Sequence, residues 1–92
     1  MEDAVIVWTD YMKYRLILRG YDPAKIEQLL RHSSERYFDT VTGRAVVIGR
    51  HENLLVMIPY ERVGGTLTPV TIHATTRQQI ISRLRSGRLK NE

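Results

Sequence analysis

The chain has 92 residues, 42% of them hydrophobic and 26% charged, which is enough for one domain over residues 1–92 with a modest core and excludes a second domain. It has no cysteine, which excludes disulfides and thiolate chemistry and favours a reducing compartment, so we expect a cytoplasmic protein. No apolar stretch approaches ~18 residues and residues 1–5 are acidic rather than basic, so neither a membrane span nor a secretory signal is predicted.

The first two predicted elements are helices. The dense apolar residues between Asp10 and Arg19 indicate a partly buried helix, and Gly20 follows it where a left-handed backbone conformation is needed. Asp22 and Pro23 then provide an N-cap and a first-turn proline for a second helix. Its apolar stripe at helical spacing consists of Ile26, Leu29 and Leu30.

After residue 34 the pattern changes to short runs rich in β-branched and aromatic residues, which predict strands over 36–41, 44–49, 54–58 and 67–73. Short turns between the runs favour an antiparallel meander, and Pro69 must avoid donating to a ladder. Alternation assigns one set of side chains to the buried face: Val46, Ile48, Val56, Ile58, Val70 and Ile72. The other face is assigned Val47, Leu55, Met57, Thr71 and His73; it is either a partly open binding surface or partly covered by the last helix.

Thr75 or Thr76 can cap a last helix that ends near Gly87 and turns Ile80, Ile81 and Leu84 to the sheet. The predicted fold class is therefore α+β, with two N-terminal helices, a four-stranded antiparallel meander and a C-terminal helix, the helices covering one sheet face.

The formal net charge of +4 lies wholly in the C-terminal part of the chain. Residues 1–34 hold five basic and five acidic side chains, whereas residues 35–92 hold nine basic and five acidic ones. From residue 76 onward the basic side chains are Arg77, Arg83, Arg85, Arg88 and Lys90, against Glu92 alone. This distribution predicts a basic C-terminal tail from about residue 86, for which a polyanion is the simplest partner.

Metal and cofactor chemistry find little support in the sequence. His32, His51 and His73 have no second ligand at close spacing, so no metal site is predicted. No glycine-rich phosphate loop is present, so no cofactor is predicted either. His73 has two open interpretations: a half-buried residue at the sheet edge, or a general base or phosphate contact beside Arg77.

Arginines at element ends indicate phosphate chemistry. RNA cleavage requires a 2′-hydroxyl to be deprotonated and a phosphorane to be stabilised, and arginine serves the second role through charge-assisted contacts. Arg50, Arg62, Arg77 and Glu61 converge if the strand ends and the last helix share one edge; the alternative is that each is an ordinary solvated charge. On the first helix, Arg15 and Arg19 share a face, bordering either solvent or the sheet.

Three segments together resemble a known family: residues 11–22, which contain Arg15, Arg19 and Gly20; residues 43–50, which end in Gly49-Arg50; and residues 70–74 before a Thr-Arg-led helix. They are similar to the small-domain family that groups with the BrnT toxins, over about residues 11–85. Tyr11 stands where that family's first helix usually has a histidine, and Gln78 where a charged residue is usual. The resemblance implies a RelE-like fold, metal-independent RNA cleavage and a cognate antitoxin, and it assigns family positions to Arg50, His73, Thr76 and Arg77.

The sequence-based hypothesis is a metal-independent endoribonuclease toxin of a toxin–antitoxin pair. Its predicted catalytic residues are Arg50, Glu61, His73 and Arg77. Its predicted RNA-binding residues are Arg62, Arg83, Arg85 and Arg88. The predicted partners are RNA, including ribosome-associated mRNA, and an antitoxin protein, with no membrane. The alternative is a non-catalytic module of the same fold that binds a protein or nucleic acid, and the two differ in whether the catalytic set meets around one phosphate position.

Overall fold

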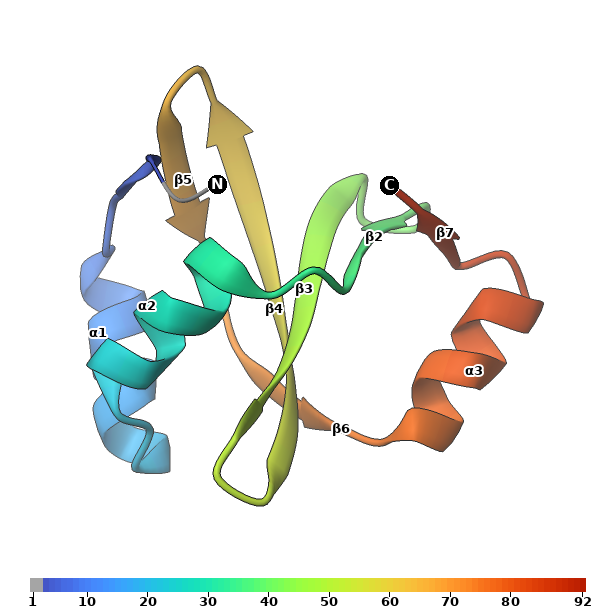
Figure 1. The fold of residues 1–92 in the computed structure, drawn as a ribbon, viewed down its shortest axis with the longest axis horizontal. Helices are drawn as coiled ribbons and strands as arrows, with labels where there is room; N and C mark the ends of the chain where they lie inside the picture. The colour runs from blue at the N-terminus through green and yellow to red at the C-terminus, as the bar shows by residue number, and fades with distance from the viewer. Residues whose placement is uncertain (1–2) are drawn as a thin grey trace.

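The computed structural model describes residues 3–92 of the chain. These residues contain three helices and seven strands (Figure 1). In chain order they are β1 (Val5–Ile6), α1 (Asp10–Arg19), α2 (Pro23–His32), β2 (Arg36–Asp39), β3 (Arg44–His51), β4 (Leu54–Val63), β5 (Thr66–Pro69), β6 (His73–Thr75), α3 (Arg77–Arg85) and β7 (Leu89–Asn91). The α+β class is confirmed. Residues 1–2 of the N-terminal segment lie outside the described residues. No helix within residues 3–92 is long and apolar enough to cross a membrane.

The sheet is larger than the predicted meander and is mixed rather than wholly antiparallel. Its strand order is β1-β5-β4-β3-β2-β7, and β6 pairs separately with β4. The β1–β5 pair is parallel and all other pairs are antiparallel. The segment after residue 86, predicted as a basic tail, returns to the sheet as β7 and pairs with β2.

Local capping explains where the helices begin and end. Thr9 Oγ1 accepts the Met12 N–H at 3.1 Å before α1, and Gly20 closes that helix with φ +72°, a left-handed conformation that glycine adopts at little cost. Asp22 Oδ1 accepts the Ala24 N–H at 2.9 Å before α2. Thr76 Oγ1 accepts the Gln79 N–H at 3.1 Å before α3. These side chains satisfy amides that have no partner inside the helix.

The predicted fourth strand, 67–73, is two strands that pair with different parts of β4. Tyr60 to Val63 pair with β5, and Leu55 to Met57 pair with β6. Pro59 and Pro69 lie where the pairing changes, and neither has an N–H to continue a ladder. A single backbone bond, from Val70 N to Pro59 O at 2.8 Å, bridges the gap.

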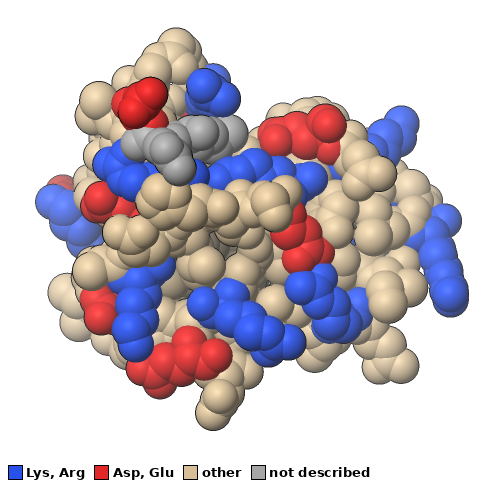
Figure 2. Space-filling view, viewed as in Figure 1, with Lys and Arg blue, Asp and Glu red and all other residues tan. Residues whose placement is uncertain are grey.

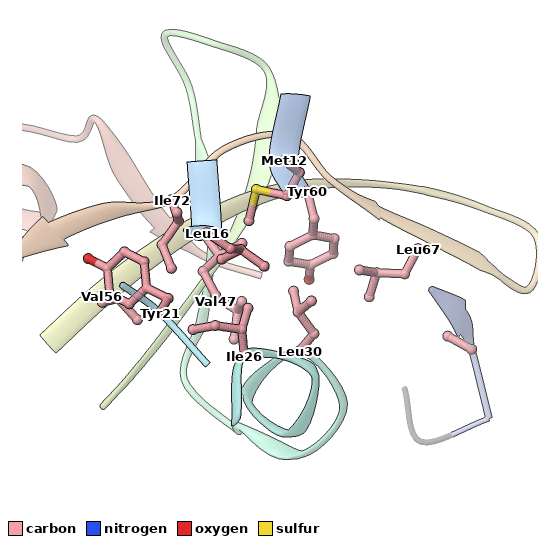
Figure 3. Close-up of a cluster of buried hydrophobic side chains, with 12 residues drawn as sticks. Met12, Leu16, Tyr21, Ile26, Leu30, Val47, Val56, Tyr60, Leu67 and Ile72 are labelled. Carbon is pink, nitrogen blue, oxygen red and sulfur yellow. The ribbon is translucent and has the colours of Figure 1, made fainter. Parts of the chain in front are cut away.

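One face of the sheet is covered by α1 and α2 (Figure 3). Met12 and Leu16 from α1 and Ile26 and Leu30 from α2 are at most 1% exposed. They pack on sheet side chains that include Val47, Val56, Ile58, Tyr60, Leu67 and Ile72. Gly49 in β3 permits this contact, because a Cβ there would overlap the side chain of Leu29 in α2.

The other face is covered by α3, so the prediction that helices cover only one face was wrong. Ile80 of α3 packs with Val46, Ile48, Leu55 and Met57 and with Leu89 of β7. Figure 1 shows α3 on the opposite side of the β3–β4 hairpin from α1 and α2. The predicted face assignment mixed the two sides, because Val47 pairs with Ile58 and Ile48 with Met57. Val46 and Ile48 therefore share a face with Met57, not with Ile58.

The two neighbouring isoleucines of α3 make a matched pair for testing this packing. Ile80 is 1% exposed and Ile81 is 45% exposed. Ile80→Ala is expected to lower the free energy of unfolding by about 2–4 kcal/mol, since it leaves a cavity under the helix, whereas Ile81→Ala should cost about 1 kcal/mol or less. Equilibrium urea unfolding of the two variants measures the difference. Equal effects would show that α3 is not anchored through Ile80.

Candidate functional site

A cleft of about 350 Å³ lies between α3 and the sheet face that α3 covers. Its lining consists of Asp39, Thr42, Met57, Pro59, His73, Ala74, Gln79, Arg83 and Arg88. These residues come from β2, β4, β6, α3 and the segments that follow β2 and α3. The cleft exists because the chain leaves the sheet at β6, crosses it as α3 and returns at β7.

His73 begins β6 and is held in register opposite Met57 of β4. Partial burial lowers the pKa of its imidazole below the ordinary 6.5, and the positive charges of Arg15, Arg19 and Arg83 lower the pKa further. At neutral pH the imidazole is therefore uncharged. A neutral imidazole can accept a proton, which is what a general base requires.

Arg83 brings a guanidinium to the same cleft from α3. Its Nη1 donates to Met57 Sδ at 3.5 Å, and the side chain is partly buried. A thioether sulfur is a weak acceptor, so an anionic oxygen would replace it at little cost. This arrangement suits the binding of a phosphate next to His73.

Asp39 and Arg88 lie at one end of the cleft. Asp39 is the last residue of β2, and Arg88 lies in the connection between α3 and β7. Asp39 is 4% exposed and accepts the N–H groups of Val41 at 2.9 Å and Thr42 at 3.2 Å, and Arg88 Nη2 at 3.4 Å. Burial alone would raise the pKa of Asp39, but these donors outweigh it and hold the pKa below the ordinary 3.8. The carboxylate thus stays ionised and fixes Arg88, whose buried Nε has no hydrogen-bond partner among residues 3–92.

Two further arginines approach His73 from the first helix. Arg15 Nε lies 3.4 Å from the carbonyl oxygen of Ile72, the residue before His73. Arg15 and Arg19 both contribute to the lowered pKa of His73. The i, i+4 spacing predicted that these arginines share a face, and in the structure Arg15 contacts the segment before β6 while Arg19 is exposed.

Of the four predicted catalytic residues, only His73 lines this cleft. Arg77 is engaged elsewhere: its Nη1 and Nη2 donate to both carboxylate oxygens of Glu35 at 2.5 and 2.8 Å. Tyr37 also donates to Glu35, at 2.8 Å, and the hydrogen bonds from Arg77 are the main reason that the pKa of Glu35 is lowered. This bidentate pair ties the start of α3 to the start of β2.

Arg50 and Glu61 lie near opposite ends of the β3–β4 hairpin. Arg50 is exposed and pairs in register with Leu55, close to the hairpin turn. Glu61 is exposed near the far end of β4, where its carboxylate lies 3.9 Å from Arg44. The structure does not bring these two residues together.

The predicted RNA-binding arginines are divided as well. Arg83 and Arg88 line the cleft, whereas Arg85 is exposed on α3. Arg62 lines a separate hollow of about 560 Å³ that also contains Arg31 and Arg36. In the view of Figure 2, basic side chains alternate with acidic ones and do not form one continuous patch.

Asp39 was not among the predicted site residues. Its sequence signal was present, since an aspartate before the Thr40–Gly43 turn is typical of a side chain that accepts turn amides. Within residues 3–92, no three histidine, aspartate or glutamate side chains group as a metal site.

Comparison with protein-family models, with curated proteins and with solved structures finds no match to this chain. The resemblance to BrnT-like chains therefore remains a prediction.

Asp39→Asn tests the anchoring of Arg88. Because the folded-state pKa of Asp39 is depressed, its ionised form stabilises the fold above its ordinary pKa of 3.8, and this stabilisation is lost as the pH falls through the folded-state pKa. The variant is expected to lose about 1–3 kcal/mol at pH 7 and to approach the wild type at low pH. Urea unfolding at pH 7 and at pH 2–3, with the exposed Glu61→Gln as a control, measures this. A loss that is the same at both pH values would contradict the assignment.

Proposed function

We propose that the protein is a metal-independent endoribonuclease of the toxin type, acting at the cleft between α3 and the sheet. One observation carries the proposal: the neutral imidazole of His73 and the guanidinium of Arg83 share one cleft with an arginine that a buried carboxylate positions. Transesterification of RNA requires a base that accepts the proton of the 2′-hydroxyl and a positive charge that stabilises the phosphorane.

In the proposed reaction His73 accepts the proton of a ribose 2′-hydroxyl, whose oxygen then attacks the adjacent phosphorus. The 2′-oxygen–phosphorus bond forms and the bond from phosphorus to the 5′-oxygen breaks, leaving a 2′,3′-cyclic phosphate and a 5′-hydroxyl. Arg83 binds the charge that develops on the phosphorane, and Arg88 is held by Asp39 to support it. Asp39 stays ionised and cannot donate a proton, so the leaving oxygen takes its proton from water.

The α+β class, the central antiparallel strands and the basic last helix are compatible with the fold that the resemblance implies, although the sheet is mixed and larger than a four-stranded meander. On this proposal the partners are RNA and an antitoxin that restrains cleavage, and the place of action is the cytoplasm. The cleft is not lined by Arg50, Glu61 or Arg77, so the proposed catalytic residues are His73 and Arg83.

One feature favours the alternative of a non-catalytic RNA-binding module. The residues lining the cleft include no neutral acid that could protonate the leaving group, because Asp39, the one carboxyl group among them, is ionised. Binding needs no proton donor, so a module of this kind would retain phosphate affinity without cleavage.

Replacing His73 or Arg83 by alanine distinguishes the two functions. Each change is expected to lower the rate of RNA cleavage by about 10²-fold or more, since each removes a group that acts on the transition state. Arg85→Ala, two residues away on the same helix and exposed, is the control and should retain most of the rate. The measurement uses total RNA and short oligoribonucleotides, with and without ribosomes, and mass spectrometry of the cyclic phosphate. Intact RNA in every case, with RNA affinity retained, would establish the binding module instead.

The pH dependence of cleavage tests the role of His73. The depressed pKa of His73 places the midpoint of the acidic limb of the rate profile below pH 6.5: the rate should rise with pH as the imidazole loses its proton, and should level off once the imidazole is neutral. Arg19→Ala removes one of the charges that lower this pKa and should shift the limb upward. A limb that does not move would argue against His73 as the base.

A further inference from the structure

The outward face of α1 is apolar, although it has no covering element among the described residues. Tyr11, Tyr14, Ile17 and Leu18 are 55%, 61%, 78% and 60% exposed. Their spacing places them on one side of the helix, opposite the buried Met12 and Leu16. Large apolar side chains gathered on one exposed face indicate an interaction surface.

This face borders a groove. The groove has a volume of about 260 Å³ and is lined by Trp8, Lys13, Leu16, Ile17 and Pro23. It runs beside α1, between the segment that precedes this helix and the first turn of α2. An exposed ridge next to a parallel groove is the shape that accepts a second helix through its i, i+3, i+4 and i+7 side chains.

The charges on α1 indicate the chemistry of the partner. Its cations are Lys13, Arg15 and Arg19, against the single carboxylate of Asp10. A second copy of this chain would bring cations against cations across the same apolar stripe, and its net charge of +4 adds to the repulsion. An acidic partner meets complementary charge.

We infer that the apolar face of α1, with its groove, docks an amphipathic helix of another protein whose apolar stripe is flanked by aspartate or glutamate. The docked helix packs its apolar side chains on Tyr14, Ile17 and Leu18, and its carboxylates pair with Lys13. This inference does not rest on RNA cleavage, because α1 packs on the Val47 and Val56 face of the sheet and the cleft lies on the Met57 face.

The fluorescence of Trp8 reports directly on binding of a helix to the groove, because Trp8 is the only tryptophan of the chain and lines the groove. The probe is a designed helical peptide of about 18 residues with leucine at helical spacing and glutamate on both flanks. A second peptide carries lysine in place of each glutamate. We expect saturable changes in Trp8 fluorescence with the glutamate peptide and much weaker binding of the lysine peptide.

Three variants locate the contact. Ile17→Asp should weaken binding of the glutamate peptide about tenfold or more, since it places a charge in the apolar face. Lys13→Glu should weaken the glutamate peptide and strengthen the lysine peptide. Val41→Asp is the matched control: Val41 is 71% exposed in the turn after β2, and its replacement should leave binding unchanged.

The inference is overturned if neither peptide changes Trp8 fluorescence, if both bind equally, or if Ile17→Asp has no effect. Sedimentation equilibrium adds a further test: a dimer of the wild type that Ile17→Asp dissociates would identify a second copy as the occupant instead. An absence of RNA cleavage would not affect the peptide-binding result, so the two proposals are tested independently.

Discussion

The antiparallel pairing of β3 with β4 is the constraint on which the rest of the structure depends. Its register places Val47 opposite Ile58 and Ile48 opposite Met57, so the hairpin presents an apolar row on each face. A strand pair that is apolar on both faces cannot leave either face in water, and α1 with α2 takes one while α3 takes the other. A shift by one residue would exchange the two rows and detach both groups of helices.

The cleft follows from the way in which α3 is held. Ile80 anchors the helix to the hairpin, the Arg77–Glu35 pair fixes its first turn, and β7 returns the chain to the edge of the sheet beside β2. A helix fixed at both ends leaves a space along its length where small or polar residues line the sheet. His73, Arg83 and Arg88 meet at this space although 14 residues of chain lie between the first and the last.

The helices could be predicted from the sequence because their signals are local. Gly20, Asp22 and Thr76 act on amides or carbonyls within a few residues, and the structure uses each of them as a cap, whereas the N-cap Thr9 of α1 was not predicted. The faces of the sheet could not be assigned in the same way. Alternation within a strand shows which side chains share a face, but the register between strands decides which faces coincide, and both rows here are apolar.

The same limit applies to the candidate site. His73, Arg83 and Arg88 were predicted as functional residues, yet nothing in their spacing indicated that one cleft would hold all three. Arg50 and Glu61 were grouped because both lie near strand ends, but they lie near opposite ends of one hairpin, where distance depends on pairing rather than on position in the chain. Asp39 was missed because a turn aspartate has a sufficient local role in capping Val41 and Thr42.

The charged residues of the cleft determine the protonation states of His73 and Asp39. Partial burial and, after it, the positive charges of Arg15, Arg19 and Arg83 lower the pKa of His73, which favours the neutral imidazole over the cation. The nearby carboxylate of Asp39 is buried, accepts two turn amides and is paired with Arg88, so it compensates Arg88 more than it does the guanidinium of Arg83. The positive charge of Arg83 is thus less compensated than that of Arg88, and it lies in the same cleft as the neutral imidazole of His73. On the proposed function, a phosphodiester of RNA would supply the missing negative charge, and the ribose 2′-hydroxyl beside it would give its proton to that base.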